Sequence, residues 1–336
     1  MKKIIIIGAT GETGMYITDY FCRKAKGEFE IIAAGLRKTQ FFDRYNIPYY
    51  SIDIGKKEAF QMLPQKDVFA VIYTAAVMPG RMKGYNPMLY LETNVCGTLN
   101  VLEYCRKVRA DRIIFTQTIR DLGNKIGKEI ITADAARDFS YKGDHAVYVI
   151  SKNAAVDLIE HYYQEYGLKR FIFRLPTIYM YTPNKYYCVN GERKIMGFRY
   201  MIDQAISGAD IELWGEPEKA HDILYVKDLA YLFYLACKSS LDGGMYNAGT
   251  GKPITLLEQI KGMIQVFGSD QKKSKIIYCP EKGSARQYTI DISKTQRELG
   301  YEPQYGYIDY LKDFKTEMED NRFADLFQGP AKTKEA

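Results

Sequence analysis

The chain has 336 residues, 46% of them hydrophobic, and its 47 basic and 41 acidic residues give a net charge of +6. This length allows one large domain or two domains that share an interface. The basic residues form no block, which argues against nucleic-acid binding, and no stretch approaches the roughly 20 apolar residues that a membrane-spanning helix needs.

The six cysteines form no CxxC pair and no cluster with the three histidines. This scatter predicts reduced thiols in a cytoplasmic protein that has no metal site.

Short apolar runs alternate with helical stretches through the first half of the chain. The runs read as strands buried on both faces, at residues 3–8, 30–35, 68–76, 112–118 and 170–176. Amphipathic segments at 86–109 and 147–166 lie between them. The alternation predicts an α/β fold, with a Rossmann-like doubly wound parallel sheet.

The rhythm of strands and helices loosens after residue 177. We therefore expect residues 1–176 to form a dinucleotide-binding Rossmann domain, to which the chain returns near 222–250. Residues 177–328 would mainly form a smaller α+β substrate-binding domain, with a strand at 211–215. The polar stretch 329–336 is expected to be a disordered tail.

A glycine-rich turn, GATGETG at residues 8–14, follows the first apolar run. Glycine permits a tight turn and a close approach of a diphosphate to backbone N–H groups, and a helix N-terminus favours its charge. This position in a βαβ unit predicts a dinucleotide site, although a turn that only packs a helix on a strand is the alternative. The expected cofactor contacts here are Gly8, Thr10, Gly11, Glu12, Thr13 and Gly14, with Asp53 and Ile54 after the next strand at the adenine edge.

The second apolar run ends at Gly35, where proteins that prefer NAD carry an acidic residue for the ribose hydroxyls. Nothing at this glycine repels a phosphate, and the cations Arg37 and Lys38 follow it. Both could pair with a 2′-phosphate, so we predict that NADP(H) is preferred over NAD(H). The alternative is that both cations belong to a solvated loop and NAD binds.

Tyrosine precedes lysine by four residues at five places, but only Tyr148 and Lys152 open a helix some thirty residues after a strand that ends in hydroxyl groups. On a helix, this spacing puts the ammonium on the same face as the phenol, where it lowers the phenol pKa towards the working pH. The pair therefore predicts acid/base catalysis of hydride transfer at an alcohol, with Thr118 sharing a hydrogen bond with the substrate hydroxyl.

In their order along the chain, these motifs resemble the extended short-chain dehydrogenase/reductases, the NAD-dependent epimerase/dehydratase family. Matching segments include VIYTAA (71–76), NVCGTLNVLEYC (94–105), FTQT (115–118), YVISK (148–152), RLPTIY (174–179) and DILYVKDLA (222–230). The resemblance implies that Thr118, Tyr148 and Lys152 are catalytic and that Lys152 also contacts the nicotinamide ribose. It adds cofactor-site residues at Ala75, Ala76, Asn94, Thr116, Pro176 and Thr177.

The chain departs from the family on the substrate side. Ile119 and Arg120 stand where sugar 4,6-dehydratases carry an Asp-Glu pair, which argues against a dehydratase. His221 replaces an arginine that grips a diphosphate in many nucleotide-sugar enzymes. Candidate substrate contacts are Met78, Arg120, Trp214, His221 and Arg286, each of which also fits a structural role.

Three functions remain open. The first is an epimerase or oxidoreductase that acts on a sugar hydroxyl or ketone, with a nucleotide sugar as substrate. The second is an NADPH-dependent reductase of a keto-sugar or another carbonyl compound. The third is a non-catalytic NADP-binding regulator, which the presence of both Tyr148 and Lys152 disfavours. The resemblance also implies a homodimer through segments 86–109 and 147–166.

Overall fold

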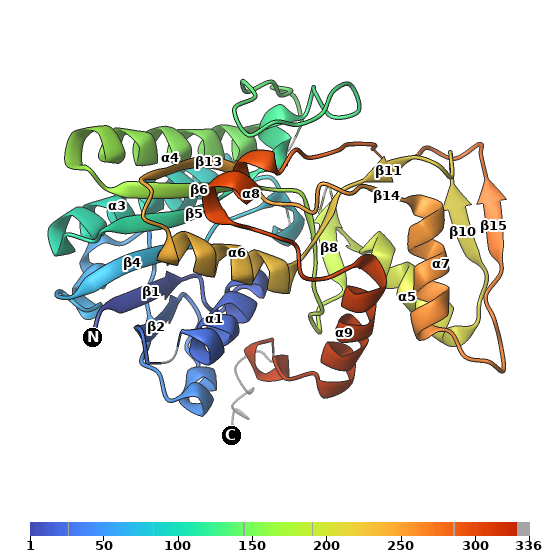
Figure 1. Ribbon diagram of the computed structural model, residues 1–336, viewed down its shortest axis with the longest axis horizontal. Coiled ribbons are helices and arrows are strands. Elements are labelled where there is room, and N and C mark those ends of the chain that lie inside the picture. Colours follow the sequence, from blue (N-terminus) through green and yellow to red (C-terminus); the bar gives the residue numbers. More distant parts are fainter. Residues whose placement is uncertain (26, 83, 144, 190, 285, 328–336) are drawn as a thin grey trace.

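The computed structural model describes residues 1–25, 27–82, 84–143, 145–189, 191–284 and 286–327. At its centre lies a parallel sheet in the order β13-β6-β5-β4-β1-β2-β3, with helices on both faces (Figure 1). This arrangement confirms the predicted doubly wound fold. The strands are β1 (Lys3–Ile7), β2 (Glu30–Gly35), β3 (Tyr49–Ser51), β4 (Val68–Tyr73), β5 (Arg112–Thr118), β6 (Lys169–Leu175) and β13 (Gly243–Asn247).

Strand β1 shows why these apolar runs build a sheet that is covered on both sides. It pairs in register with β2 and β4, so that Ile5 lies opposite Ile32 and Val71. Successive side chains point to opposite faces. Ile4 and Ile6 therefore enter one apolar cluster, whereas Ile5 and Ile7 enter another.

Four helices cover the two faces of the sheet (Figure 1). Helices α1 (Glu12–Lys24) and α6 (Val226–Lys238) contribute to the first cluster. Helices α3 (Gly97–Val108) and α4 (His145–Tyr166) contribute to the second. Their apolar stripes pack on the sheet, and this packing supplies most of the stability of such helices.

The predicted helix at 86–109 is observed, and it contains a π-helical turn. It consists of α2 (Pro87–Tyr90), the π-helical segment η4 (Leu91–Cys96) and α3, and the residues at both junctions have α-helical backbone angles. The wider turn directs the buried side chain of Asn94 towards the chain that follows β4, where it bonds to both backbone groups of Val77. Such π-turns interrupt helices most often at functional sites.

The second half of the chain builds a smaller part beside the sheet, at the right of Figure 1. Its strand pairs are short: β7 with β12, the β8–β9 hairpin, β10 with β15, and β11 with β14. The predicted strand at 211–215 is observed as β10. The bounds are β7 (Thr177–Tyr179), β8 (Tyr186–Val189), β9 (Glu192–Ile195), β10 (Ile211–Trp214), β11 (Ala220–His221), β12 (Ile223–Tyr225), β14 (Ile254–Thr255) and β15 (Ile276–Cys279).

The remaining helices also lie in the second half of the chain. They are α5 (Gly197–Ser207), α7 (Leu256–Phe267), α8 (Ser293–Leu299) and α9 (Tyr307–Asp320). Short 3₁₀ turns join the elements at η1 (Phe41–Tyr45), η2 (Lys57–Met62), η3 (Pro79–Arg81), η5 (Ile119–Leu122) and η6 (Ala324–Leu326).

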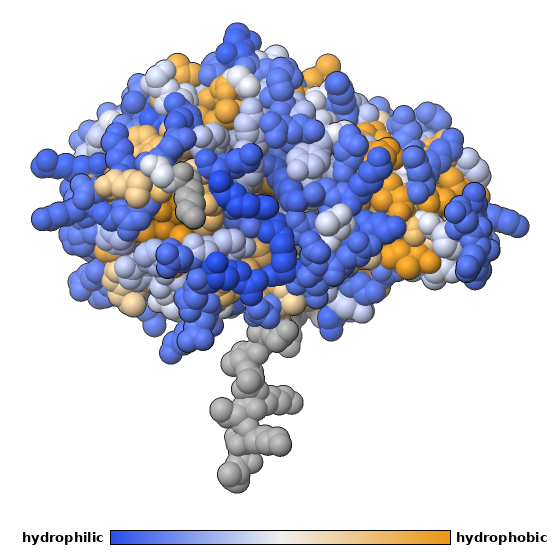
Figure 2. Space-filling model, turned by 60° about the horizontal axis from the view of Figure 1, so that its bottom comes forward, coloured by the Kyte–Doolittle hydropathy of each residue, from blue (hydrophilic) through white to orange (hydrophobic). Residues whose placement is uncertain are grey.

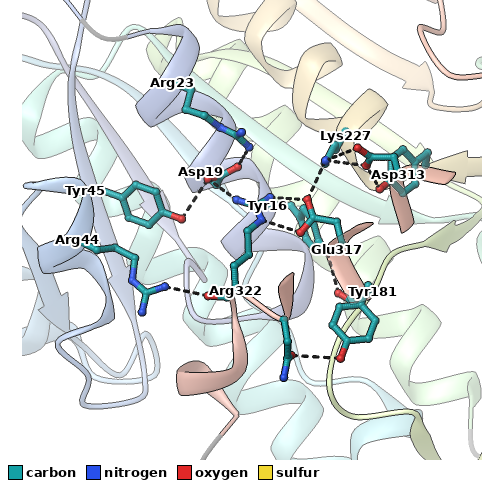
Figure 3. A network of polar contacts seen from close by, with 12 residues as sticks. Tyr16, Asp19, Arg23, Arg44, Tyr45, Tyr181, Lys227, Asp313, Glu317 and Arg322 are labelled. Atoms are coloured by element: carbon teal, nitrogen blue, oxygen red, sulfur yellow. Dashed lines mark hydrogen bonds and ion pairs between the residues drawn. The ribbon is translucent and has the colours of Figure 1, made fainter. Parts of the chain in front are cut away.

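A polar network fixes the chain after α9 against the Rossmann sheet (Figure 3). Arg322 lies 2.6 Å from a carboxylate oxygen of Asp19 in α1 and 2.6 Å from one of Glu317 in α9. Both acids are buried, and Lys227 of α6 lies 2.8 Å from Glu317. The network carries η6 to the end of β2, where the cofactor cations were predicted.

The face of the molecule shown in Figure 2 is mostly hydrophilic, and its apolar residues form separate patches. No helix among the described residues is long and apolar enough to cross a bilayer.

Candidate active site

The glycine turn lies where the order of the sheet reverses, between the carboxyl ends of β1 and β4. Open α/β sheets bind ligands at this point. Gly8 has φ +97°, and a Cβ there would lie 2.6 Å from the backbone nitrogen of Ala75. A Cβ at Gly14 would lie 2.0 Å from the carbonyl oxygen of Gly8. Side chains are excluded at both positions, so the chain after β4 lies directly against the turn that opens α1.

The end of β2 also has a steric reason for glycine. A Cβ at Gly35 would lie 2.5 Å from the hydroxyl oxygen of Thr10 in the glycine turn. The Tyr49 hydroxyl donates to the carbonyl of Gly35 at 3.2 Å, and it also bonds to the carbonyl of Arg37. A larger side chain at this position would therefore have to displace the hydroxyl of Thr10.

Arg37 and Lys38 line a cavity of about 930 Å³ together with Arg81 and Arg193, and Asp325 contributes a carboxylate to it. The guanidinium of Arg37 already has a partner, because it donates to the carbonyl of Leu326 in η6. It also lies 5.4 Å from the centre of the Phe327 ring. The segment after α9 thus closes one side of this cationic cavity.

Asp53 and Ile54 have local structural partners. Asp53 is exposed, and its carboxylate accepts the backbone N–H of Gly55 at 2.9 Å as in a turn. Ile54 is buried, and a Cβ at Gly97 would lie 3.0 Å from its side chain. A contact of either residue with adenine stays a prediction.

Thr118 and Tyr148 meet at the end of β5. Tyr148 is 8% exposed, and burial raises the pKa of its phenol to about 12. A hydrogen bond with Thr118 and the charge of Arg120 act in the opposite direction, because both favour the phenolate. The phenol is therefore protonated at neutral pH in the protein without cofactor.

Lys152 lies one helical turn after Tyr148 and is 3% exposed. Its ammonium nitrogen is 3.9 Å from the centre of the Phe115 ring. Burial lowers the pKa of the lysine to about 7, because the charged form loses its hydration. The helical spacing of Lys152 predicts a lowered pKa for the Tyr148 phenol. In the protein without cofactor, burial is the larger effect and raises that pKa.

Buried amides and hydroxyls hold this helix turn in place. Asn94 donates to the hydroxyl of Ser151 at 3.0 Å, and that hydroxyl donates to the carbonyl of Tyr148 at 2.7 Å. Gln117 donates to Asn153 at 2.8 Å and accepts the backbone N–H of Thr118 at 2.8 Å. Asn94 therefore ties the chain after β4 to α4, and Gln117 ties β5 to α4.

A cavity of about 440 Å³ lies beside Thr118 and brings together several predicted substrate residues. It is lined by Thr118, Arg120, Pro176, Thr177, His221, Arg286 and Tyr288, among others. Among the described residues, no Asp or Glu side chain lines this cavity. Burial lowers the pKa of His221, so its imidazole is neutral at pH 7.

Two predicted substrate residues do not line this cavity. Trp214 is 51% exposed on β10, where its indole N–H donates to Glu212 at 2.8 Å. The Lys282 ammonium lies 4.8 Å from the centre of its ring. Met78 is 42% exposed in the chain that follows β4. Trp214 therefore fits the edge-strand alternative.

Tyr288 lines the cavity although sequence reasoning did not select it. Its hydroxyl lies 3.2 Å from that of Thr177, and its ring centre is 5.6 Å from that of His221. The only available signal was its place two residues after Arg286.

Among the cofactor-site residues, Thr116 is buried within β5, and Ala75 and Ala76 follow β4. No group of three His, Cys, Asp or Glu side chains in the described ranges could hold a metal ion.

Comparisons with known proteins agree with this arrangement. The chain is 24% identical over 323 residues to a putative UDP-glucose 4-epimerase of Methanocaldococcus jannaschii, which covers 95% of this chain and 99% of that protein. It is 26% identical to a dTDP-glucose 4,6-dehydratase of Escherichia coli, over 90% of this chain and 88% of that one. The structure of UDP-glucose 4-epimerase from Thermotoga maritima with UDP-glucose has a TM-score of 0.76 and 21% identity, covering 95% of this chain and 100% of that one.

A family model described as the NAD dependent epimerase/dehydratase family matches residues 4–249. The matched region runs from β1 through β13 and includes the glycine turn as well as Thr118, Tyr148 and Lys152. On this match, the chain belongs to the NAD-dependent epimerase/dehydratase family of enzymes.

Proposed function

We propose that the protein is an epimerase that acts on a hydroxyl-bearing carbon of a nucleotide sugar. The observation that carries this proposal is the buried phenol of Tyr148 at the end of β5, next to Thr118, which lines a cavity together with Arg120 and Arg286. Relatives named UDP-glucose and UDP-glucuronate 4-epimerases support the substrate class.

A nicotinamide dinucleotide bound by the glycine turn would supply reversible hydride transfer at the sugar carbon. Tyr148 takes the proton of the reacting hydroxyl during oxidation and gives a proton back during reduction. Thr118 orients that hydroxyl by a hydrogen bond. Lys152 holds the ribose next to the nicotinamide, and its charge favours the phenolate when it is protonated.

The cations of the smaller cavity have separate tasks in this proposal. Arg286 pairs with the diphosphate of the substrate, because a guanidinium matches phosphate oxygens in pairs. Arg120 faces the sugar, since it follows Thr118 by two residues and its charge acts on Tyr148. Ile119 and Arg120 leave no carboxylate in the position that a dehydratase uses, so elimination of water is not part of the proposed reaction.

The preference for NADP(H) is also proposed. Gly35 leaves no acid to repel a 2′-phosphate, and Arg37 and Lys38 face a cavity that holds two further arginines. A guanidinium has five N–H donors, so Arg37 can keep its bond to Leu326 and still bind a phosphate. The two cations thereby favour a second candidate function, an NADPH-dependent reductase of a keto-sugar or another carbonyl compound.

One experiment separates the two functions. UDP-, GDP- and dTDP-sugars are offered to the purified enzyme while absorbance at the nicotinamide band and sugar products are followed. An epimerase converts one sugar into its epimer without net change in absorbance, whereas a reductase consumes NADPH in proportion to product. Tyr148→Phe should reduce either activity by about a thousandfold while cofactor affinity changes less than threefold. Normal turnover in this variant would contradict the catalytic role of Tyr148, whereas binding of NADPH without turnover of any sugar by wild type would favour the regulator.

We also propose the domain division at residues 176 and 177 and a homodimer through α3 and α4. The apolar side chains of Leu99 in α3 and Ile150 in α4 are 41% and 39% exposed. A mass near twice 38.7 kDa in light scattering would support the dimer.

A further inference from the structure

Arg81 joins three separate elements at the proposed cofactor site. Its guanidinium pairs with both carboxylate oxygens of Glu12, the first residue of α1. It also donates to the carbonyl of Tyr186, the first residue of β8. Arg81 itself is the last residue of η3, in the chain that follows β4. One side chain therefore connects the glycine turn, the chain after β4 and the β8–β9 hairpin.

The position of this ion pair follows from the topology. Glu12 comes from the turn after β1, and Arg81 comes from the chain after β4. These strands are neighbours at the point where the sheet order reverses. The two segments touch at their base, where Ala75 lies against Gly8, and the ion pair joins them again farther along. The pair thus spans the crevice in which open α/β sheets hold their ligands.

The charges make this connection more than a structural link. Glu12 places a carboxylate at the helix N-terminus that the diphosphate of a dinucleotide would use, and two anions at one place repel each other. Arg81 neutralises the carboxylate. A guanidinium has five N–H donors, and Arg81 uses only some of them for its bonds to Glu12 and Tyr186. The remaining N–H groups can donate to a phosphate oxygen.

We propose that Glu12, Arg81 and the carbonyl of Tyr186 form a strap that closes over the diphosphate of the dinucleotide and slows its release. The proposal rests on the dinucleotide site proposed above. Arg81 is then a positioning residue for the cofactor: it screens Glu12 from the diphosphate and holds the hairpin across the crevice. Release requires the ion pair to open, so dissociation is slower than a site open to solvent would allow.

Stopped-flow measurement of NADPH fluorescence on the full chain tests the strap. Arg81→Ala should raise the dissociation rate about tenfold or more, while the association rate changes less than threefold. Arg81→Lys should have an intermediate effect, because a single ammonium nitrogen can pair with Glu12 but lacks the second guanidinium nitrogen that donates to the carbonyl of Tyr186. Arg106→Ala is the matched control, since Arg106 forms a surface ion pair with Glu103 in α3 and should leave the rate unchanged.

Glu12→Gln supplies the second arm. If the two side chains act as one strap, Glu12→Gln alone raises the dissociation rate, and the double variant with Arg81→Ala dissociates no faster than Arg81→Ala does. The proposal is overturned if Arg81→Ala changes the rate less than twofold. It is also overturned if the two fold-changes multiply in the double variant, because the residues then act independently.

Failure of the cofactor site itself gives a different pattern. Gly8→Val places side-chain atoms against Ala75 and should abolish NADPH binding. The proposed cofactor site is wrong if wild type binds neither NADPH nor NADH, or if Gly8→Val binds NADPH as tightly as wild type does. In either case the proposal of the strap is wrong as well. If Gly8→Val loses binding and Arg81→Ala releases NADPH at the wild-type rate, only the strap is wrong.

Discussion

The charge state of Lys152 is set by its burial. The side chain lies within α4 against the Phe115 ring, and its pKa falls from 10.5 to about 7. Between these values, the unfolded chain binds a proton at Lys152 that the folded chain does not bind. The free energy of unfolding therefore gains a contribution that rises with pH across this window.

Lys152→Met should remove this contribution. The variant keeps the length of the side chain but carries no charge, so it should be more stable than wild type at pH 6.5, by about 2 kcal/mol. The difference should be smaller at pH 9.5, because the free-energy cost of burying Lys152 in wild type falls as the pH rises. Urea unfolding at both pH values measures it. A difference that is independent of pH would show that Lys152 is not buried in its neutral form.

Arg37 carries the predicted choice of cofactor. Arg37→Ala should weaken NADP binding about tenfold and change NAD binding less than twofold at moderate salt, because only NADP has a 2′-phosphate. Arg44→Ala is the control, since Arg44 pairs with Asp325 nearby but does not line the cationic cavity. Calorimetric titration with both dinucleotides gives the two affinities. Equal losses for both, with NAD bound at least as tightly as NADP by wild type, would contradict the preference.

At the scale of elements, Arg322 connects α1 to α9 (Figure 3). The chain after α9 then places η6 against Arg37, beyond the end of β2. Arg322→Leu would leave buried Asp19 with the exposed Arg23 and the hydroxyl of Tyr45, and Glu317 with Lys227 as its remaining ion-pair partner in the described network. Removing one member of a buried ionic group costs about 3–5 kcal/mol. We expect a loss of about 3 kcal/mol in the free energy of unfolding.

Arg23→Ala is the matched control for this loss. Arg23 pairs with the same carboxylate, but its side chain is 58% exposed. Exposed ion pairs contribute about 0–1 kcal/mol, so this variant should unfold close to wild type in a thermal or urea transition. If both variants lost the same stability, burial of the network would not be its important property.

Elements with a local signal were predictable from the sequence, and elements fixed by distant partners were not. The isoleucine run of β1 and the glycine turn can each be recognised from fewer than ten residues of sequence. Strand β13 has the sequence GGMYN, which has no apolar run, and it is a strand because it pairs with β6. The π-turn at η4 likewise has no local signal in the sequence, and its Asn94 bonds to Val77 in the chain after β4.

The same division holds within the site. Tyr148 and Lys152 were found by their helical spacing together with their place after the strand at 112–118, and Gly35 by its position at the end of an apolar run. The role of Gln117 has no sequence signal, and only the structure shows that it bonds to both Thr118 and Asn153. Tyr288 reaches the cavity from the far end of the chain, and spacing carries no information about such a contact.

At the scale of the whole molecule, the sheet is not continuous in the sequence. Strand β6 ends at Leu175, the chain then builds β7–β12 and α5 of the smaller part, and it returns to add β13 beside β6. Helix α6 lies in the same returning stretch and covers one face of the sheet (Figure 1). The two parts therefore complete each other's cores.

This order has a consequence for the protein while it is being synthesised. Roughly 70 residues separate β6 from β13, and at about 5–20 residues per second a ribosome needs several seconds to make them. During that interval the nascent sheet has an unpaired β6 edge and a face without α6, and such edges readily pair with other chains. The period in which a partly made chain is most exposed to aggregation, and most in need of a chaperone, is therefore the time taken to translate residues 176–247.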